Sequence, residues 1–175
     1  LRECCSTPNR EFDLWYADEA GFTTIPSVPY AWQKVGERLE LASAHSPRQS
    51  VFGLLSLQHK FCSFVFPQAL DSATIVTCLD KFCARLRRPA LVVIDNAPIH
   101  TSATFAARRP VWEEKGLHFL SLPSYCPELN LIEHLWRKIK YEWLPLNATQ
   151  SFENLTEELF KVLKSISSKY RITFT

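Results

Sequence analysis

The chain has 175 residues, of which 46% are hydrophobic and 22% charged, and its formal net charge is +2. This length allows one domain with a substantial core and excludes two domains of ordinary size, and the balance of residue types is that of a soluble globular protein. The apolar runs are too short to span a bilayer and the N-terminus shows no signal peptide, so we expect neither membrane insertion nor secretion. A charge so close to neutral does not by itself predict nucleic-acid binding, because a surface that grips DNA strongly usually carries a large basic excess.

The start of the chain carries few structural signals. Because the chain begins at Leu1 and contains no methionine, we expect a fragment that lacks an N-terminal region. Residues 1–11 are interpreted as a lead-in from that region, and residues 12–175 as one domain whose C-terminal end is also consistent with truncation. The six cysteines include no CxxC pair and no zinc-finger spacing, and without a secretory signal they favour free thiols over disulfides.

The first half of the domain is dominated by β-type patterns. Residues 12–17 are apolar and aromatic, which predicts a strand that ends at Asp18. Two further β-type runs, 51–57 and 61–66, are joined by the short segment 58–60 and together predict a hairpin.

The second half alternates between helical and β-type periods. Residues 72–87 repeat apolar side chains every three to four positions, with Asp71 or Ser72 as the N-cap and Pro89 as the stop signal. Residues 90–94 are continuously apolar, which is typical of a strand buried on both faces. The remaining predicted elements are a helix over 101–115 that Pro110 should break or kink, a strand over 117–122, and helices over 127–143 and 151–165. This order predicts an α/β domain with a mixed sheet, in which helix-linked strands pair in parallel.

Two aspartates stand where strands are predicted to end. Asp95 directly follows the strand over 90–94, and Asp18 follows the first strand. In open α/β sheets, ligands bind beyond the carboxyl ends of the strands. Each aspartate taken alone is better explained as a turn cap, which is a common use of Asp after a strand.

Glu133 lies on the predicted helix over 127–143, at the edge of its apolar stripe. The stripe consists of Leu129, Ile132, Leu135, Trp136, Ile139 and Trp143. A glutamate in this position is often a surface group, but it becomes informative if Asp18 and Asp95 meet it. Three converging carboxylates would repel one another, and a hard dication with oxygen ligands removes that repulsion. Two such ions can support an in-line phosphoryl displacement.

Three segments resemble, in order, the signature blocks of the DDE transposases of the insertion-sequence 630 and mariner superfamily: residues 16–22 (YADEAGF), 92–100 (VVIDNAPIH) and 125–136 (YCPELNLIEHLW). The resemblance implies a ribonuclease H-like fold and places Asp18, Asp95 and Glu133 on the catalytic triad of the family. It also implies two Mg²⁺ or Mn²⁺ ions as cofactors. The activity implied is metal-dependent DNA strand cleavage and strand transfer during cut-and-paste transposition.

The same resemblance implies partners and a location. The partners would be transposon-end DNA, target DNA and a second copy of the full-length protein. An upstream helix-turn-helix region would read the transposon ends, which would explain the modest charge of this chain. The protein would act in the bacterial cytoplasm with the nucleoid, or in the nucleus of a eukaryote.

Two positions depart from the family pattern. Cys126 stands where serine is usual, and Leu131 stands where proline is usual. The loss of proline allows the catalytic helix to begin a turn earlier, and either change is also consistent with a decayed copy. Two alternatives therefore remain open, a ribonuclease H-like nuclease that does not join strands and an inactive or domesticated remnant.

Five polar residues near the three acids are further candidates for the site. Asn96 and His100 follow Asp95 and are candidates for positioning a phosphate or a water, although a structural hydrogen bond explains them equally well. Arg137, Lys138 and Lys140 follow Glu133 and are candidates for DNA phosphate contacts, with a solvated basic helix face as the alternative.

Overall fold

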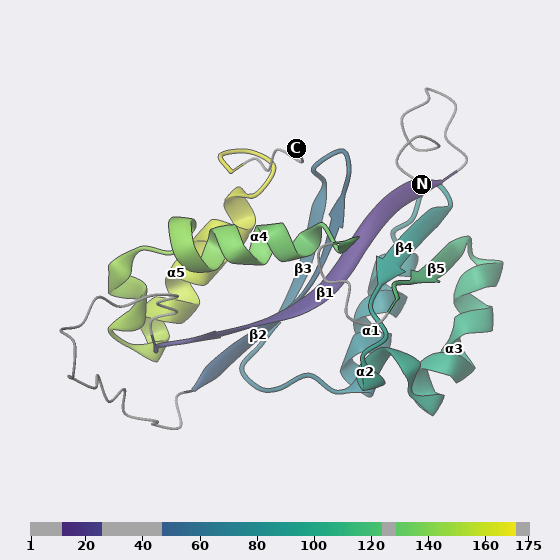
Figure 1. Ribbon diagram of the computed structural model, residues 1–175, viewed down its shortest axis with the longest axis horizontal. Coiled ribbons are helices and arrows are strands. Elements are labelled where there is room, and N and C mark those ends of the chain that lie inside the picture. Colours follow the sequence, from purple (N-terminus) through teal and green to yellow (C-terminus); the bar gives the residue numbers. More distant parts are fainter. Residues whose placement is uncertain (1–11, 26–46, 124–128, 171–175) are drawn as a thin grey trace.

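The computed structural model describes residues 12–25, 47–123 and 129–170, which form a mixed five-stranded sheet flanked by helices (Figure 1). The strands are β1 (Asp13–Thr23), β2 (Arg48–Ser56), β3 (Phe61–Phe66), β4 (Ala90–Ile94) and β5 (Leu117–Ser121). The helices are α1 (Ser72–Cys83), α2 (Pro98–Thr101), α3 (Ala103–Glu114), α4 (Ile132–Lys138), the π-helical η2 (Ile139–Trp143), the 3₁₀ helix η3 (Leu146–Thr149) and α5 (Phe152–Ser165). This arrangement confirms the predicted α/β class and mixed sheet.

The sheet has the strand order β3-β2-β1-β4-β5, with β1 at its centre. Strands β1, β2 and β3 pair antiparallel, whereas β4 pairs parallel with both β1 and β5. The predicted hairpin is therefore present as β2 and β3, and the predicted parallel pairing is present among the strands that helices connect. Within the hairpin turn, His59 has a positive φ of 60°, a left-handed conformation that tight turns require.

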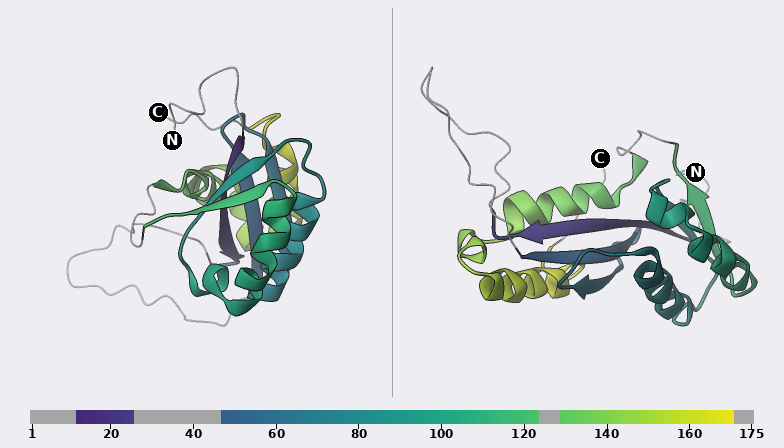
Figure 2. Two further views of the ribbon diagram at one scale, coloured as in Figure 1. Left: turned by 90° about the vertical axis from the view of Figure 1, so that its right-hand side faces the viewer. Right: turned by 90° about the horizontal axis from the view of Figure 1, so that it is seen from below.

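The central strand has a hydrophobic core on each of its faces. Alternate residues of β1 such as Leu14 and Tyr16 pack with α4 and α5, whereas Trp15 and Ala17 pack with α1 and α3. Helices α4 and α5 lie beside β1 to β3, and α1 to α3 lie beside β4 and β5 (Figures 1 and 2).

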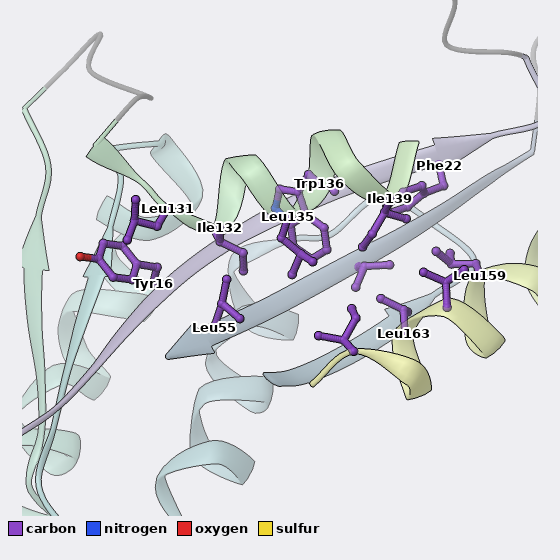
Figure 3. Packing of buried hydrophobic residues seen from close by; sticks show 14 of the residues in the cluster. Tyr16, Phe22, Leu55, Leu131, Ile132, Leu135, Trp136, Ile139, Leu159 and Leu163 are labelled. Carbon is purple, nitrogen blue, oxygen red and sulfur yellow. The ribbon is translucent and has the colours of Figure 1, made fainter. Parts of the chain in front are cut away.

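The first of these cores holds α4 against the sheet. Figure 3 shows Ile132 of α4 and Leu55 of β2 pointing toward one another, with Leu159 of α5 also facing this core. Both Ile132 and Leu135 are fully buried, so the face of α4 that carries them is held in one orientation.

The first strand extends further than the sequence predicts. Residue Asp18 lies inside β1 and not after its end, because β1 pairs with β2 from Trp15 (opposite Ser56) to Thr23 (opposite Arg48). The pairing with β4 ends earlier, at Tyr16 opposite Val93. The prediction that the strand ends at Asp18 was therefore wrong, because the long-range pairing with β2 keeps the chain extended.

The helix that carries Glu133 starts later in the sequence than predicted. Helix α4 begins at Ile132, and the residues 129–131 before it are not α-helical, while residues 124–128 lie outside the described part of the chain. Leu129, expected in the apolar stripe, is 48% exposed. The side-chain amide of Asn130 donates to the carbonyl of Ala17 at 3.0 Å, which ties this segment to β1. The expectation of an earlier helix start was therefore wrong, since that contact holds the preceding residues outside the helix.

Two other helices differ in extent from their predictions. Helix α1 has the predicted N-cap Asp71 but ends at Cys83, and Ser102 caps α3 separately from α2 where one helix was predicted over 101–115. Helix α3 continues through Pro110, which is exposed, so water can hydrate the carbonyl that proline leaves without a donor. No helix within the described residues is long and apolar enough to cross a membrane.

Candidate active site

Asp18 and Asp95 lie on neighbouring parallel strands. The last aligned pair of β1 and β4 is Tyr16 opposite Val93, and each aspartate lies two residues beyond its member of that pair. Asp95 directly follows the last residue of β4, so it stands at the carboxyl end of a parallel strand as expected. The sheet therefore places these two residues, which are 77 positions apart in the sequence, at the same level of neighbouring strands.

The carboxylate of Asp18 is buried and held by an indole. Asp18 is 9% exposed, and Nε1 of Trp136 donates to its Oδ2 at 3.1 Å. Opposite Asp18 on β2 stands Gly53, where an added Cβ would lie 2.5 Å from Cη2 of Trp136. The indole thus lies directly over the β2 backbone, and the missing side chain of Gly53 makes room for it.

The environment of Asp18 opposes its ionisation. Burial is the largest cause, and the negative charges of Glu133, Glu19 and Asp95 add to it, so that the pKa of Asp18 is raised to about 8. A carboxyl group in this state is largely protonated at neutral pH. A cation placed among these acids would reverse the effect.

Glu133 lies in the first turn of α4, and its backbone N–H donates to the carbonyl of Asn130 at 3.0 Å. It is partly buried, and its charge is the strongest electrostatic influence on Asp18. Within the described residues, however, no three His, Cys, Asp or Glu side chains are grouped so that they could hold a metal ion together. The structure therefore brings Glu133 near Asp18 without forming a three-carboxylate cluster.

Asp95 is held by a histidine instead of an indole. Its Oδ1 accepts from Nδ1 of His100 at 2.6 Å and from the backbone N–H of Ala97 at 3.1 Å. The hydrogen bond from His100 is the main reason why the pKa of Asp95 is lowered. Burial alone would lower the pKa of His100, but its contacts with Asp95 and Glu19 outweigh that effect and raise this pKa to about 9. The imidazole is therefore a cation at neutral pH.

Glu19, which directly follows Asp18 in the sequence, completes this arrangement. Its Oε1 lies 3.2 Å from Nε2 of His100, and its side chain is only 19% exposed. Because successive residues of a strand face opposite sides of the sheet, Glu19 points away from the α4 side on which Asp18 lies. The alternation of β1 was the signal that placed Glu19 on the side of α2 and α3.

The other two groups of candidate residues have more ordinary contacts. The amide of Asn96 donates to the carbonyl of Leu122 at 2.6 Å, which links the segments that follow β4 and β5. Of the basic residues, Lys138 pairs with Glu142 at 2.9 Å, Lys140 lies 5.6 Å from the centre of the Phe22 ring, and Arg137 is exposed. Of these three side chains, Lys138 is the one with an ion-pair partner among the described residues.

Comparison with known proteins connects this geometry to a family. Residues 13–169 match the family described as DDE superfamily endonuclease, whereas a comparison with curated protein sequences gives no match. Among solved structures, the Mos1 strand transfer complex is 15% identical with a TM-score of 0.60, and the match covers 89% of this chain and 48% of that chain. The chain thus spans about half the length of that relative.

Two isolated catalytic domains match with more of their own length. The Mos1 transposase catalytic domain with raltegravir and Mg is 14% identical with a TM-score of 0.59, covering 88% of this chain and 72% of that chain. The catalytic core domain of BIV integrase is 15% identical with a TM-score of 0.56, covering 92% of this chain and 87% of that chain. At these identities the likeness concerns the fold, and it confirms the expected ribonuclease H-like architecture. Since the family match covers most of the chain and its three signature blocks are present in order, this protein belongs to the DDE superfamily endonucleases.

Proposed function

We propose that this chain is the catalytic domain of a transposase that cleaves DNA strands and transfers them by metal-dependent phosphoryl transfer. The observation that carries this proposal is the register of β1 and β4, which sets Asp18 and Asp95 at the same level of adjacent parallel strands, with Glu133 near enough to raise the pKa of Asp18. Two of these acids come from the sheet and the third from α4, so the site depends on the docking of α4 onto β1.

The donor set fits divalent metal ions. Carboxylate oxygens are the ligands that Mg²⁺ and Mn²⁺ prefer, and Asp18 is a buried acid surrounded by other negative charges. In our proposal Asp18, Asp95 and Glu133 hold two ions. When bound, such ions polarise the phosphate and activate a water or a 3′-hydroxyl. Similar folds have been solved as the Mos1 catalytic domain with Mg and with Mn, which supports this choice of metals.

The side chains of the protein itself have positioning roles in this proposal. Trp136 fixes the carboxylate of Asp18, and His100 fixes that of Asp95. Asn96 holds the segment after β4 against the segment after β5, which keeps Asp95 near the sheet. Arg137 is the best candidate for a DNA phosphate contact, because Lys138 is paired with Glu142.

The proposed partners are transposon-end and target DNA, with a second copy of the full-length protein. The similar Mos1 structures are a strand transfer complex and a paired-end complex, which supports DNA as the substrate. The protein would act wherever that DNA lies, in the bacterial cytoplasm or in a nucleus.

A plasmid assay with Mn²⁺ tests the proposal. We expect the wild-type protein to nick supercoiled DNA, and Asp18→Asn, Asp95→Asn and Glu133→Gln to lose more than about a hundredfold, since even indirect ligand partners contribute tenfold to a hundredfold. Asp13→Asn is the matched control, because Asp13 is the first residue of β1 and lies before the segment that carries Asp18. An oligonucleotide with a free 3′-hydroxyl tests joining in the same reaction. Nicking without joining would favour the nuclease, and equal nicking by wild type and Asp95→Asn would reject the site.

A further inference from the structure

We propose that Glu19 is a positioning residue that acts through His100 to fix the carboxylate of Asp95. The inference rests on the proposed function, in which Asp95 is a metal ligand. It assigns a role to an acid that is not one of the three proposed ligands and that lies on the opposite side of the sheet from Asp18.

A continuous chain of contacts joins the two acids. Oε1 of Glu19 lies 3.2 Å from Nε2 of His100, and Nδ1 of the same ring lies 2.6 Å from Oδ1 of Asp95. The backbone N–H of Ala97 donates to that same oxygen at 3.1 Å. Both hydrogen bonds to Asp95 thus involve Oδ1, which leaves Oδ2 as the oxygen available to a metal ion.

The three side chains in this series of contacts are exposed to different extents, and the histidine between the two acids is the most buried. The side chain of His100 is 1% exposed, that of Glu19 is 19% exposed and that of Asp95 is 48% exposed. The ring is enclosed where it meets both acids and lies near Phe105, with 6.2 Å between the ring centres. The ring is hydrogen-bonded to Asp95 at Nδ1, and its Nε2 lies within ion-pair distance of Glu19 without a hydrogen bond of good geometry, so the charge of Glu19 can restrict how the buried ring turns toward Asp95.

The topology explains why the support comes from Glu19. Asp95 follows β4, the neighbour of β1, and Glu19 lies on β1 directly after Asp18. Neighbouring side chains of a strand face opposite sides of the sheet, so Glu19 and Asp18 lie on different sides. Glu19 therefore contacts Asp95 only indirectly, through His100. Residues that orient a ligand in this way commonly change metal affinity by tenfold to a hundredfold.

A set of four variants tests whether Glu19 acts through His100. In Glu19→Ala the ring loses its partner at Nε2, whereas Glu19→Gln keeps an acceptor oxygen at the same reach. In His100→Asn the amide can still donate to Asp95 but is too short to reach Glu19, and this variant is also combined with Glu19→Ala. The control is Glu113→Ala, which removes a carboxylate paired with Arg109 at 2.9 Å on α3.

The main measurement is the Mn²⁺ concentration that produces half of the metal-induced rise in melting temperature, and it requires no catalytic activity. We expect Glu19→Ala to raise that concentration about tenfold, Glu19→Gln to raise it by less than about threefold, and Glu113→Ala to leave it unchanged. A residue with a merely structural role would lower the melting temperature without metal and leave this concentration unchanged.

The double variant decides whether the two residues act as one unit. If Glu19 acts through His100, adding Glu19→Ala to His100→Asn should cause no further loss. Independent, multiplying effects would overturn the inference, as would wild-type metal dependence in Glu19→Ala. Failure of the proposed function has a different signature, namely a wild-type rise in melting temperature with Mn²⁺ in Asp95→Asn. In that case the inference about Glu19 fails as well.

Discussion

Asp18 and Asp95 are the same type of residue on neighbouring strands, yet the protein stabilises opposite states of their carboxyl groups. Asp18 is buried, accepts a hydrogen bond from a neutral indole, and has a pKa raised to about 8. Asp95 is half exposed, accepts a hydrogen bond from His100, and has a lowered pKa. On the side of the sheet that faces α4, the charges near Asp18 are those of other acids. On the side that faces α2, the cation next to Asp95 is the imidazole of His100.

The difference shows how a metal site can be assembled in two steps. The Asp95 side is preorganised, because His100 already compensates its charge and fixes one oxygen. The Asp18 side is incomplete, because burial and the charge of Glu133 favour the protonated form of the Asp18 carboxyl group. In our proposal a bound dication favours its ionised form. Metal binding should therefore change the state of Asp18 much more than that of Asp95.

The largest expected effect is a pH dependence that comes from Asp18 and the acids around it. The pKa of Asp18 is raised from 3.8 to about 8 in the folded protein, so its contribution to metal-free stability is fully present below about pH 4 and is lost progressively as the pH rises to about 8. The metal requires the ionised form, so its affinity should increase by about tenfold per pH unit below pH 8, with about one proton released. Calorimetric titration with Mn²⁺ in buffers of different ionisation enthalpy measures the number of protons released. Binding at pH 7 without proton release would contradict the proposed difference between Asp18 and Asp95.

The next effect should disturb the Asp18 side and leave the Asp95 side intact. In Gly53→Ala the new Cβ would lie 2.5 Å from the Trp136 ring, so the indole must move and its hydrogen bond to Asp18 is lost. We expect a destabilisation of about 1–3 kcal/mol and weaker Mn²⁺ binding. The control is Gly21→Ala, whose Cβ would meet only the flexible end of Arg48. Denaturant unfolding with and without Mn²⁺ compares the two, and equal losses would show that the indole has no special role.

Neutral substitutions should affect stability in opposite directions on the two sides. Asp18→Asn removes an acid that burial and repulsion destabilise, so the metal-free protein should gain about 1 kcal/mol, or about 2–4 °C in melting temperature. Asp95→Asn removes the charged partner of His100, and because that side chain is half exposed the loss should also be limited to about 1 kcal/mol. Thermal unfolding at pH 7 in a chelator tests this, and shifts of the same sign would contradict the proposed difference.

The smallest effect concerns the basic residues of α4. Arg137→Ala should weaken DNA binding at all sequences alike and reduce the salt dependence by about one phosphate contact. Lys138→Ala should have less effect on DNA, because Lys138 is paired with Glu142, and the exposed pair contributes about 0.3–0.5 kcal/mol to stability. Gel-shift titrations over a range of salt concentrations separate the two variants, and a larger effect from Lys138 would assign the phosphate contact to it.

Local sequence patterns determined several elements closely. The strand over 90–94 and the second hairpin strand over 61–66 have the predicted bounds, and the final helix begins one residue later than predicted, because each depends on neighbouring residues and their periodicity. The first hairpin strand, β2, begins at Arg48 instead of 51, since its pairing with β1 extends it. The three signature blocks also identified the family, and the order of strands predicted that Asp95 would stand at the carboxyl end of β4.

Only the tertiary structure decided how the candidate site is assembled. Asp18 is inside β1 because the distant strand β2 pairs with it, and α4 begins at Ile132 because Asn130 bonds to Ala17, which is 113 positions earlier in the chain. The contact between Glu19 and His100 likewise depends on β1 and β4 lying side by side. A single sequence shows which residues can interact, but long-range pairing sets the distances between them. Those distances are the reason why the pKa of Asp18 is raised and that of Asp95 is lowered.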